Sequence, residues 1–169
     1  MKYHKDQYVV YNGLQICRFG EVVKKSFDGA GEKEYCTLFP TDVKSTYYVL
    51  SDKIEETIRP ILTKEQLLEL IDRFPYAKSE WPGNRSNLKC VFWSAVKKGD
   101  YNSIIPLLNR IYNEKSKREG REKQLLNEDK RNFETVIRFL HSEIAFSFGI
   151  GIDETETFIS NRIKEHCHN

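Results

Sequence analysis

The sequence has no apolar run that approaches the ~20 residues needed to cross a bilayer. Its first stretch, MKYHKDQYVVYNG, also lacks the apolar segment of a secretory signal. These absences argue against a membrane-spanning role and lead us to expect a cytoplasmic protein. The composition, with 39% hydrophobic and 31% charged residues among 169, is that of a folded chain. This length is enough for one ordinary domain or for two small ones.

Signatures of catalysis are also missing. The sequence contains no glycine-rich phosphate loop, no GxSxG nucleophile turn and no HExxH zinc motif. Three of the four histidines lie near the chain ends, and His141 falls in a predicted helix, where a structural histidine is the simpler interpretation. The carboxylates lie on predicted helix faces, without an isolated pair in an apolar setting. We therefore predict no enzyme, no catalytic residue and no cofactor.

The cysteines do not form a metal-binding pattern. All four are scattered, without a CxxC pair. Cys17 and Cys36 occur among apolar, strand-like residues, which suits reduced thiols in a core. The tail His166-Cys167-His168 contains metal-binding residue types but lacks a second ligand pair. We predict no metal site.

Charge of one sign is not in large excess, since the formal net charge is only +2. The overall charge therefore does not indicate a nucleic-acid partner. The stretch 110–123, RIYNEKSKREGREK, is locally basic. A solvated helix end or linker is the simpler interpretation of such a run, and phosphate contact is the alternative.

The first part of the chain has the period of β-strands. Runs rich in β-branched and aromatic residues alternate with turn residues, at 8–11, 15–25, 34–39 and 45–50. Asn12-Gly13 predicts a tight turn between the first two runs. Alternation within 15–25 predicts two faces, with Ile16, Arg18 and Gly20 on one and Cys17, Phe19 and Glu21 on the other. We predict a small antiparallel β-barrel of the SH3 or Tudor type over residues 1–59.

The apolar period then becomes helical, and residues 60–169 are predicted to form a compact domain of five helices. Thr63 and Gln66 form a capping box before the first helix. This helix stops at Pro75 and carries its apolar residues on one side: Leu67, Leu68, Ile71 and Phe74. The fold class is therefore α+β, with the β domain followed by the helical domain.

Three of the later helices have clear sequence signals. One is predicted over 87–98, with Gly99 as its left-handed stop. Another shows the strongest apolar stripe of the chain, made by Phe133, Ile137, Leu140, Ile144 and Phe148. The last helix is predicted to be capped by Asp153 together with Glu156.

The two tryptophans occur in different settings. Trp93, in CVFWSAVKK, has apolar helical neighbours and is expected to be buried or to contact another helix. Trp81 stands alone in the turn-rich stretch SEWPGNRSN. One interpretation is that Trp81 covers a small hydrophobic cluster. The other is that its indole is held out to stack on a nucleobase, with Arg85 and Lys89 on phosphates and Asn84 on a base edge.

A set of segments, taken in order and spacing, resembles the CarD family of bacterial transcription regulators over most of the chain, from about Tyr3 to about Lys164. The segments are YVVYNG, EKEYCTLF, STYYVLSDKIEETIRPILTKEQ, SEW followed by Asn84 and Arg85, KKGD at 97–100, and a helix ending HSEIAFSFGI. The chain departs from the family after the tryptophan, where the family has more basic residues. Here Arg85 is followed by Ser86 and Asn87, which implies a weaker grip on the DNA backbone.

The resemblance implies a role in transcription. Members of the family have a Tudor-like N-terminal domain, shared with transcription-repair coupling factors, that binds the β subunit of RNA polymerase. Their helical domain contacts promoter DNA at the upstream edge of the bubble, where a tryptophan wedges into the minor groove and holds the open complex. Trp81 matches that tryptophan. By this analogy Trp81, Asn84, Arg85 and Lys89 are the expected DNA-binding residues.

The polymerase is expected to dock on an exposed strand edge around residues 43–50. Strand addition supplies main-chain hydrogen bonds, and Lys25, Lys44 and Tyr47 are the side chains expected to contribute specificity. The partners are then the polymerase β subunit and promoter DNA, and a monomer suffices. Two alternatives stay open. In one, the protein is an adaptor that binds a protein partner through the β domain without touching DNA. In the other, the barrel itself binds RNA or DNA through Tyr47, Tyr48 and basic neighbours.

Overall fold

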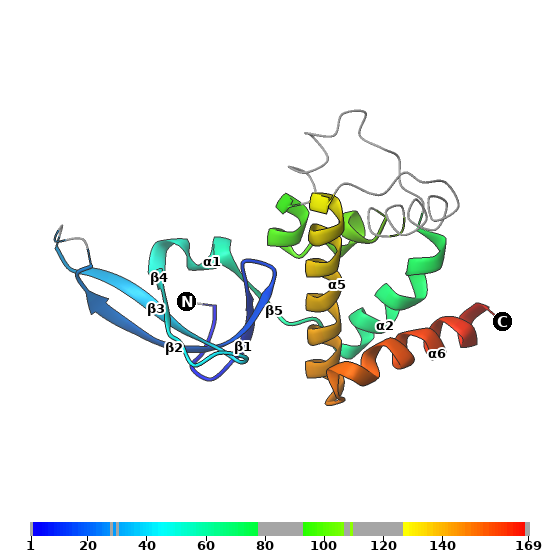
Figure 1. Ribbon diagram of the computed structural model, residues 1–169. Helices are drawn as coiled ribbons and strands as arrows, with labels where there is room; N and C mark the ends of the chain where they lie inside the picture. The colour runs from blue at the N-terminus through cyan, green and yellow to red at the C-terminus, as the bar shows by residue number, and fades with distance from the viewer. Residues whose placement is uncertain are drawn as a thin grey trace. The chain divides into compact units, whose positions relative to one another are not determined.

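A computed structural model describes residues 2–27, 29, 31–77, 93–106, 109 and 127–167. The chain divides into two compact units, Met1–Ile61 and Leu62–Asn169, and each is described by itself. The first contains a five-stranded antiparallel sheet and the second consists of helices (Figure 1). The fold is therefore α+β. The sequence placed the change from strand to helix after residue 59.

The sheet has the strand order β4-β3-β2-β1-β5, and every neighbouring pair is antiparallel. The strands are β1 (Tyr8–Tyr11), β2 (Gln15–Lys25), β3 (Lys33–Pro40), β4 (Tyr47–Leu50) and β5 (Ile58–Pro60). The predicted strands at 8–11 and 15–25 are confirmed, β4 is shorter than predicted, and β5 was not predicted. The short helices η1 (Ser51–Lys53) and α1 (Ile54–Thr57) connect β4 to β5.

The turn between β1 and β2 forms for the reason that the sequence indicated. Asn12 and Gly13 have φ values of 48° and 75°, the left-handed region in which glycine and asparagine are tolerated best. This geometry reverses the chain so that Tyr11 pairs with Gln15. The predicted tight turn is therefore confirmed.

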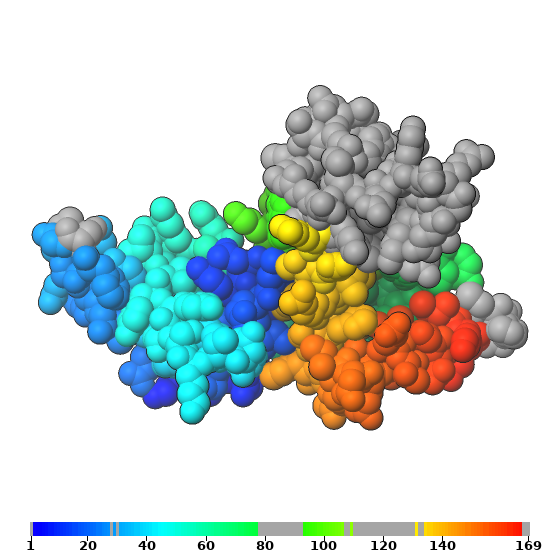
Figure 2. Space-filling model, in the orientation of Figure 1, coloured from blue at the N-terminus to red at the C-terminus, as the bar shows by residue number. Residues whose placement is uncertain are grey.

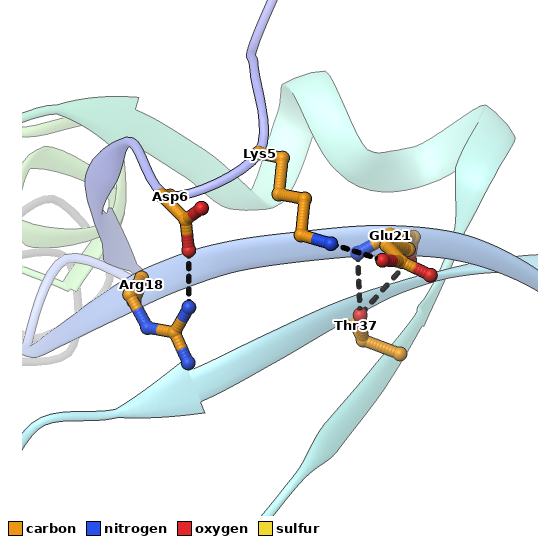
Figure 3. A network of polar contacts seen from close by, with 5 residues as sticks. All are labelled: Lys5, Asp6, Arg18, Glu21 and Thr37. Carbon is orange, nitrogen blue, oxygen red and sulfur yellow. Dashed lines mark hydrogen bonds and ion pairs between the residues drawn. The ribbon is translucent and has the colours of Figure 1, made fainter.

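The side chains of β2 do not alternate as predicted, because the strand contains a bulge. The pairing of β2 with β3 shifts register between Phe19 and Val22, so Phe19 is buried while Glu21 is exposed. The hydroxyl of Thr37 takes the place of the lost ladder bonds. It accepts from the Glu21 N–H at 2.8 Å and donates to the Glu21 carbonyl at 2.9 Å (Figure 3). A bulge of this kind bends the strand and increases its twist.

Exposed ion pairs flank this bulge. Figure 3 shows Lys5 donating to the Glu21 carboxylate and Arg18 donating to Asp6. All four side chains are more than 40% exposed, so solvent screens each pair and it contributes little to stability. The bulge therefore depends mainly on Thr37.

The main buried cluster of the first unit lies on one face of the sheet, and Val10 and Ile16, which alternate with its members Val9 and Cys17, are buried as well. The buried members of this cluster are Tyr3, Val9, Cys17, Phe19, Cys36, Leu38, Val49, Ile54 and Ile58. Cys17 and Cys36 are free thiols with no exposed surface. Burial, helped by the charge of Asp42, raises the pKa of Cys17 to about 12. This thiol therefore stays protonated and acts as a small apolar side chain.

The second unit contains α2 (Lys64–Arg73), α5 (Asn127–Phe148) and α6 (Thr155–Cys167), with further helical turns at 93–98 and 101–106. The short helices η2 (Phe74–Tyr76) and η3 (Ile152–Glu154) follow α2 and precede α6. Figure 1 shows α5 in yellow and orange, next to α2 and α6. Their shared core is formed by Leu67, Leu70, Ile71, Ile105, Leu140 and Ile144.

The helix ends confirm some predictions and correct others. The capping box is present, because the Gln66 N–H donates to the Thr63 hydroxyl and the Gln66 side chain accepts from the Thr63 N–H. Gly99, with φ 66°, stops the helix that includes 93–98, while residues 87–92 of that prediction lie outside the described residues. The predicted cap of the last helix was wrong. Glu154 accepts from the Gly151 N–H at 2.6 Å, and α6 begins at Thr155.

The apolar faces of the helices also differ from the prediction in detail. On α2, Leu70 is buried together with Leu67 and Ile71, and Leu68 is only half-buried. Among the described side chains of α5, the buried apolar residues are Val136, Phe139, Leu140 and Ile144. Ile137 and Phe148 of the predicted stripe are half-buried, and the side chain of Phe133 lies outside the described part. Trp93, expected to be buried or to contact another helix, is half-buried.

A bidentate ion pair joins α2 to α6. Arg162 Nε and Nη2 donate to the two carboxylate oxygens of Asp72 at 2.8 and 2.7 Å, and His166 Nε2 lies 3.2 Å from the same carboxylate. The Asp72 side chain is only 22% exposed. The Arg162 hydrogen bonds lower the pKa of Asp72 below its ordinary value, although partial burial opposes them.

We expect Asp72→Asn to lower the free energy of unfolding of the helical unit by about 1.5 kcal/mol at neutral pH. Because the folded protein lowers the pKa of Asp72, the stabilisation is present above about pH 4 and is lost as the pH falls through the folded pKa. Urea titrations of both proteins from neutral to acid pH measure this difference. Glu69→Gln, in an exposed pair with Arg73, is the control and should change stability by less than about 0.5 kcal/mol. A constant Asp72→Asn difference down to about pH 2 would contradict the argument.

Candidate functional site at the edge of the sheet

The structure describes one of the two predicted sites. Trp81, Asn84, Arg85 and Lys89, the expected DNA-binding residues, lie outside the described residues. Lys25, Lys44 and Tyr47, the expected polymerase-binding residues, all lie on or near β4. The geometry of this strand therefore decides what the β unit offers to a partner.

Strand β4 is one of the two edges of the sheet. It pairs with β3 through Leu38↔Tyr47, Thr37↔Tyr48, Cys36↔Val49 and Tyr35↔Leu50, and it has no second neighbour in the strand order of the described residues. The opposite edge, β5, ends in Pro60, which has no N–H to offer to an added strand. β4 contains no proline. It is therefore the edge that is open to strand addition.

The loop that leads into β4 surrounds a hollow of about 510 Å³, lined by residues 39–46. Two residues fix the base of this loop. Thr41 donates its N–H and its hydroxyl to the Ile16 carbonyl at 3.1 and 3.2 Å, and Gln15 Nε2 donates to Asp42 Oδ1 at 2.6 Å. Val43 and Lys44 are exposed. The loop therefore presents an apolar and a cationic side chain immediately before the edge strand.

The three predicted polymerase-binding residues do not form one cluster. Tyr47 is half-buried against the core, and its ring centroid lies 5.5 Å from that of Tyr11. Lys25 belongs to the opposite face of the sheet, where its Nζ lies 5.2 Å from the centroid of the Tyr48 ring. Lys44 lies in the loop. Tyr47 therefore supports the edge strand from the core side, Lys25 lies on the other face of the sheet, and Lys44 belongs to the loop that precedes β4.

Sequence reasoning missed an aromatic cluster on the sheet face opposite the core. The rings of Phe27 and Tyr35 have centroids 5.1 Å apart, and those of Phe27 and Tyr48 lie 5.2 Å apart. We call Phe27, Tyr35 and Tyr48 the outer-face cluster. Its signal was present in the sequence, because Tyr35 alternates with the core residue Cys36, and Tyr48 with Val49.

A buried carboxyl group in the helical unit was also missed. Glu143 on α5 has no exposed surface. It accepts from the Leu62 N–H at 3.0 Å and from the Tyr101 hydroxyl at 2.5 Å. The sequence pattern placed the carboxylates on helix faces, and it did not show that this one is buried. Both partners satisfy Glu143 as a structural group.

A half-buried histidine and a groove also belong to the described part of the helical unit. His141 lies beside Glu143 in sequence, and burial lowers its pKa while Glu156 opposes the shift. A groove of about 930 Å³ runs along α2 and residues 99–106, and at its rim Arg73 donates to Asn102 Oδ1 at 2.9 Å. Within the described part of the chain, no three His, Cys, Asp or Glu side chains are placed to hold a metal ion.

No protein-family model matches the chain, and a search of curated proteins found no match. Within the described residues, no single helix is long and apolar enough to cross a membrane. The pair Glu134–Phe148 and Ile152–His166 meets the criteria of length and composition only when counted together across a 109° bend.

Proposed function

We propose that the protein is a transcription regulator that docks on the β subunit of RNA polymerase through its β unit and contacts promoter DNA through its helical unit. In this proposal the helical unit holds the open complex at the upstream edge of the bubble, with Trp81 as the wedge. The open β4 edge is the observation that carries the proposal. The resemblance of the sequence to the CarD family supplies the identity of the partners.

The arrangement of the strands supports an SH3- or Tudor-like form for the β unit. In the order β4-β3-β2-β1-β5, the strands that come first and last in the sequence, β1 and β5, are neighbours at one end of the sheet. Short helices connect β4 to β5. The bulge in the long strand β2 supplies the bend that a small barrel requires. We propose, as part of the same hypothesis, a barrel that stays open between β4 and β5, so that the β4 edge remains accessible to an added strand.

The proposed mechanism needs only modest DNA affinity. Docking at β4 raises the local concentration of the helical unit at the upstream DNA. Stacking of one base on an aromatic side chain contributes about 1–3 kcal/mol, which is enough to shift a melting equilibrium. Trp81 acts in this way only if it contacts opened DNA more favourably than closed duplex, because a ligand with equal affinity for both states shifts nothing.

We expect the full chain to capture the purified β-lobe fragment of bacterial RNA polymerase, and the amides of β4 to exchange more slowly in the complex. An added strand would pair with those β4 amides that face away from β3, and pairing protects them from exchange. Hydrogen exchange of residues 47–50 with and without the fragment measures this effect. The amides of β5 are the internal control and should be unchanged.

Trp81→Ala is the matched variant for the DNA half of the proposal. The variant should still capture the polymerase β-lobe fragment, and its β4 amides should still exchange more slowly in the complex. The lifetime of a promoter open complex should become shorter than with the unmodified chain. Capture without any change in β4 exchange would refute docking by strand addition. Failure of the folded chain to retain polymerase at low salt would leave a protein-interaction adaptor as the better interpretation.

A further inference from the structure

The outer-face cluster exposes more aromatic surface than the fold requires. Phe27 is 58% and Tyr48 is 38% exposed, and both rings contact one another rather than the core. Tyr48 pairs with Thr37, and its neighbour Val49 turns to the buried side. The cluster therefore belongs to the solvent face of β2, β3 and β4, where strand residues are ordinarily polar.

The cluster lies at the end of a hairpin that extends beyond its neighbour. β2 and β3 remain paired to Lys25↔Lys33, whereas the pairing of β3 with β4 stops at Tyr35. Figure 1 shows the two blue strands continuing past β4, and Figure 2 shows the same end of the unit exposed to solvent. A chain-like ligand can therefore reach the rings without passing over other parts of the β unit that the structure describes.

Lysines accompany the rings. Lys25 Nζ lies 5.2 Å from the Tyr48 ring centroid, a cation–π distance, and Lys25 is directly opposite Lys33 in the ladder. The carboxylate of the bulge, Glu21, forms an ion pair with Lys5.

Stacked rings with adjacent lysines match one ligand chemistry well. The flat faces of bases stack on aromatic side chains, and phosphates pair with ammonium groups. A duplex keeps its base faces inside the stack, so only a single strand offers both. We propose that the outer-face cluster, with Lys25 and Lys33, binds single-stranded nucleic acid. This site lies on the β unit and does not depend on the proposed polymerase docking.

The test measures the affinity of the full chain for a fluorescein-labelled oligothymidine of about 12 nucleotides by anisotropy, in about 50 mM salt. All variants carry Trp81→Ala, so that the DNA contact proposed for the helical unit does not provide the signal. Phe27→Ala and Tyr48→Ala should each weaken binding about 5- to 10-fold, because each removes one stacking surface. Tyr48→Phe keeps the ring and should stay within about 2-fold.

Two further variants separate this site from general surface effects. Lys25→Gln should weaken binding and reduce the salt dependence, because one ammonium–phosphate pair fewer lowers the slope of log K against log salt by about 0.7. Tyr8→Ala removes a tyrosine of similar exposure, 41%, from β1 and should leave the affinity unchanged. Photo-crosslinking with bromodeoxyuridine should attach the oligonucleotide to peptides that contain Phe27, Tyr35 or Tyr48.

The proposal is overturned if the Trp81→Ala chain does not bind the oligonucleotide, if the Phe27→Ala and Tyr48→Ala variants bind it equally well, or if the crosslinks map elsewhere. Capture of the polymerase fragment by the Phe27→Ala variant, which leaves β4 unchanged, separates the two proposals. We expect capture to be retained. Its loss, with oligonucleotide binding unchanged, would assign the rings to protein docking instead. Oligonucleotide binding without polymerase capture would overturn the proposed function and leave this inference standing.

Discussion

Glu143→Leu is expected to lower the free energy of unfolding of the helical unit by about 3 kcal/mol, since it removes a buried acceptor to which two half-buried residues donate. The Glu143 side chain has no exposed surface. One carboxyl oxygen accepts from the Leu62 N–H at 3.0 Å and the other from the Tyr101 hydroxyl at 2.5 Å. Leucine fits the volume of the site approximately but cannot accept either of these hydrogen bonds. The loss of a hydrogen bond to a buried acceptor in this way costs about 1–3 kcal/mol.

The effect should be localised, because Glu143 fixes the start of the helical unit onto α5. One turn further along α5, the Ser147 hydroxyl donates to the Leu62 carbonyl at 3.3 Å. Both backbone groups of Leu62 are therefore bound by side chains of the same helix. Glu143→Gln keeps an acceptor for the Leu62 N–H and places an amide near Tyr101, whose hydroxyl can accept. It should therefore cost only about 1 kcal/mol.

Tryptophan fluorescence during urea unfolding measures this change, because the only two tryptophans, Trp81 and Trp93, belong to the helical unit. Unfolding of the β unit does not contribute to that signal, and this matters since two units need not unfold in one step. Glu134→Leu is the matched control, because Glu134 is an exposed residue of the same helix. It should alter stability by less than about 0.5 kcal/mol. Equal losses for the Glu134 and Glu143 variants would show that the burial argument is wrong.

Glu143 also shows what the sequence could and could not reveal. Periodicity located α5, since apolar residues at helical spacing identify a buried face. It did not reveal that an acidic residue lies on that face. The available signal was the position of Glu143, three residues after Leu140 and four after Phe139, both buried. Its partners, Leu62 and Tyr101, are distant in sequence, and only the tertiary structure brings them to it.

The β unit shows the same division between local and distant information. The turn at Asn12-Gly13 and the strand periods are properties of short segments, and they were predicted correctly. The bulge in β2 depends on Thr37 from another strand, so alternation alone placed Glu21 wrongly. The edge position of β4 follows from the strand order, which no single segment specifies. The expected DNA-binding residues around Trp81 lie outside the described residues, and their role stays a prediction.

Gly20→Ala is expected to destabilise the β unit by about 2–3 kcal/mol, the cost of an extra carbon in a filled site. A Cβ at this position would collide with Thr37 Oγ1 and would lie 2.6 Å from Phe39 Cε2 and 3.1 Å from the Thr37 carbonyl oxygen. Thr37 has little freedom to move, because its hydroxyl bonds to both backbone groups of Glu21. The backbone oxygen cannot rotate away. The bulge must therefore shift or open.

The labelling rate of the buried thiols measures this loss of stability. Cys17 and Cys36 have no exposed surface in the β unit, so they react with an alkylating reagent only after the unit opens. In a Cys90→Ser/Cys167→Ser background, about 2 kcal/mol corresponds to labelling about 30-fold faster. Ser26→Ala, an exposed change in the hairpin, should leave the rate nearly unchanged.

Gly29→Ala distinguishes steric collision from backbone strain. A Cβ at Gly29 would meet open space, but the residue has a φ of 70°, which costs alanine about 1 kcal/mol. If the buried thiols are alkylated no faster in the Gly20→Ala variant than in the Gly29→Ala variant, the close packing against Thr37 and Phe39 is not a constraint on the fold. If they are alkylated much faster, the bulge is a fixed part of the sheet. Because Thr37 is also the ladder partner of Tyr48, the same substitution should then weaken capture of the polymerase fragment at the β4 edge.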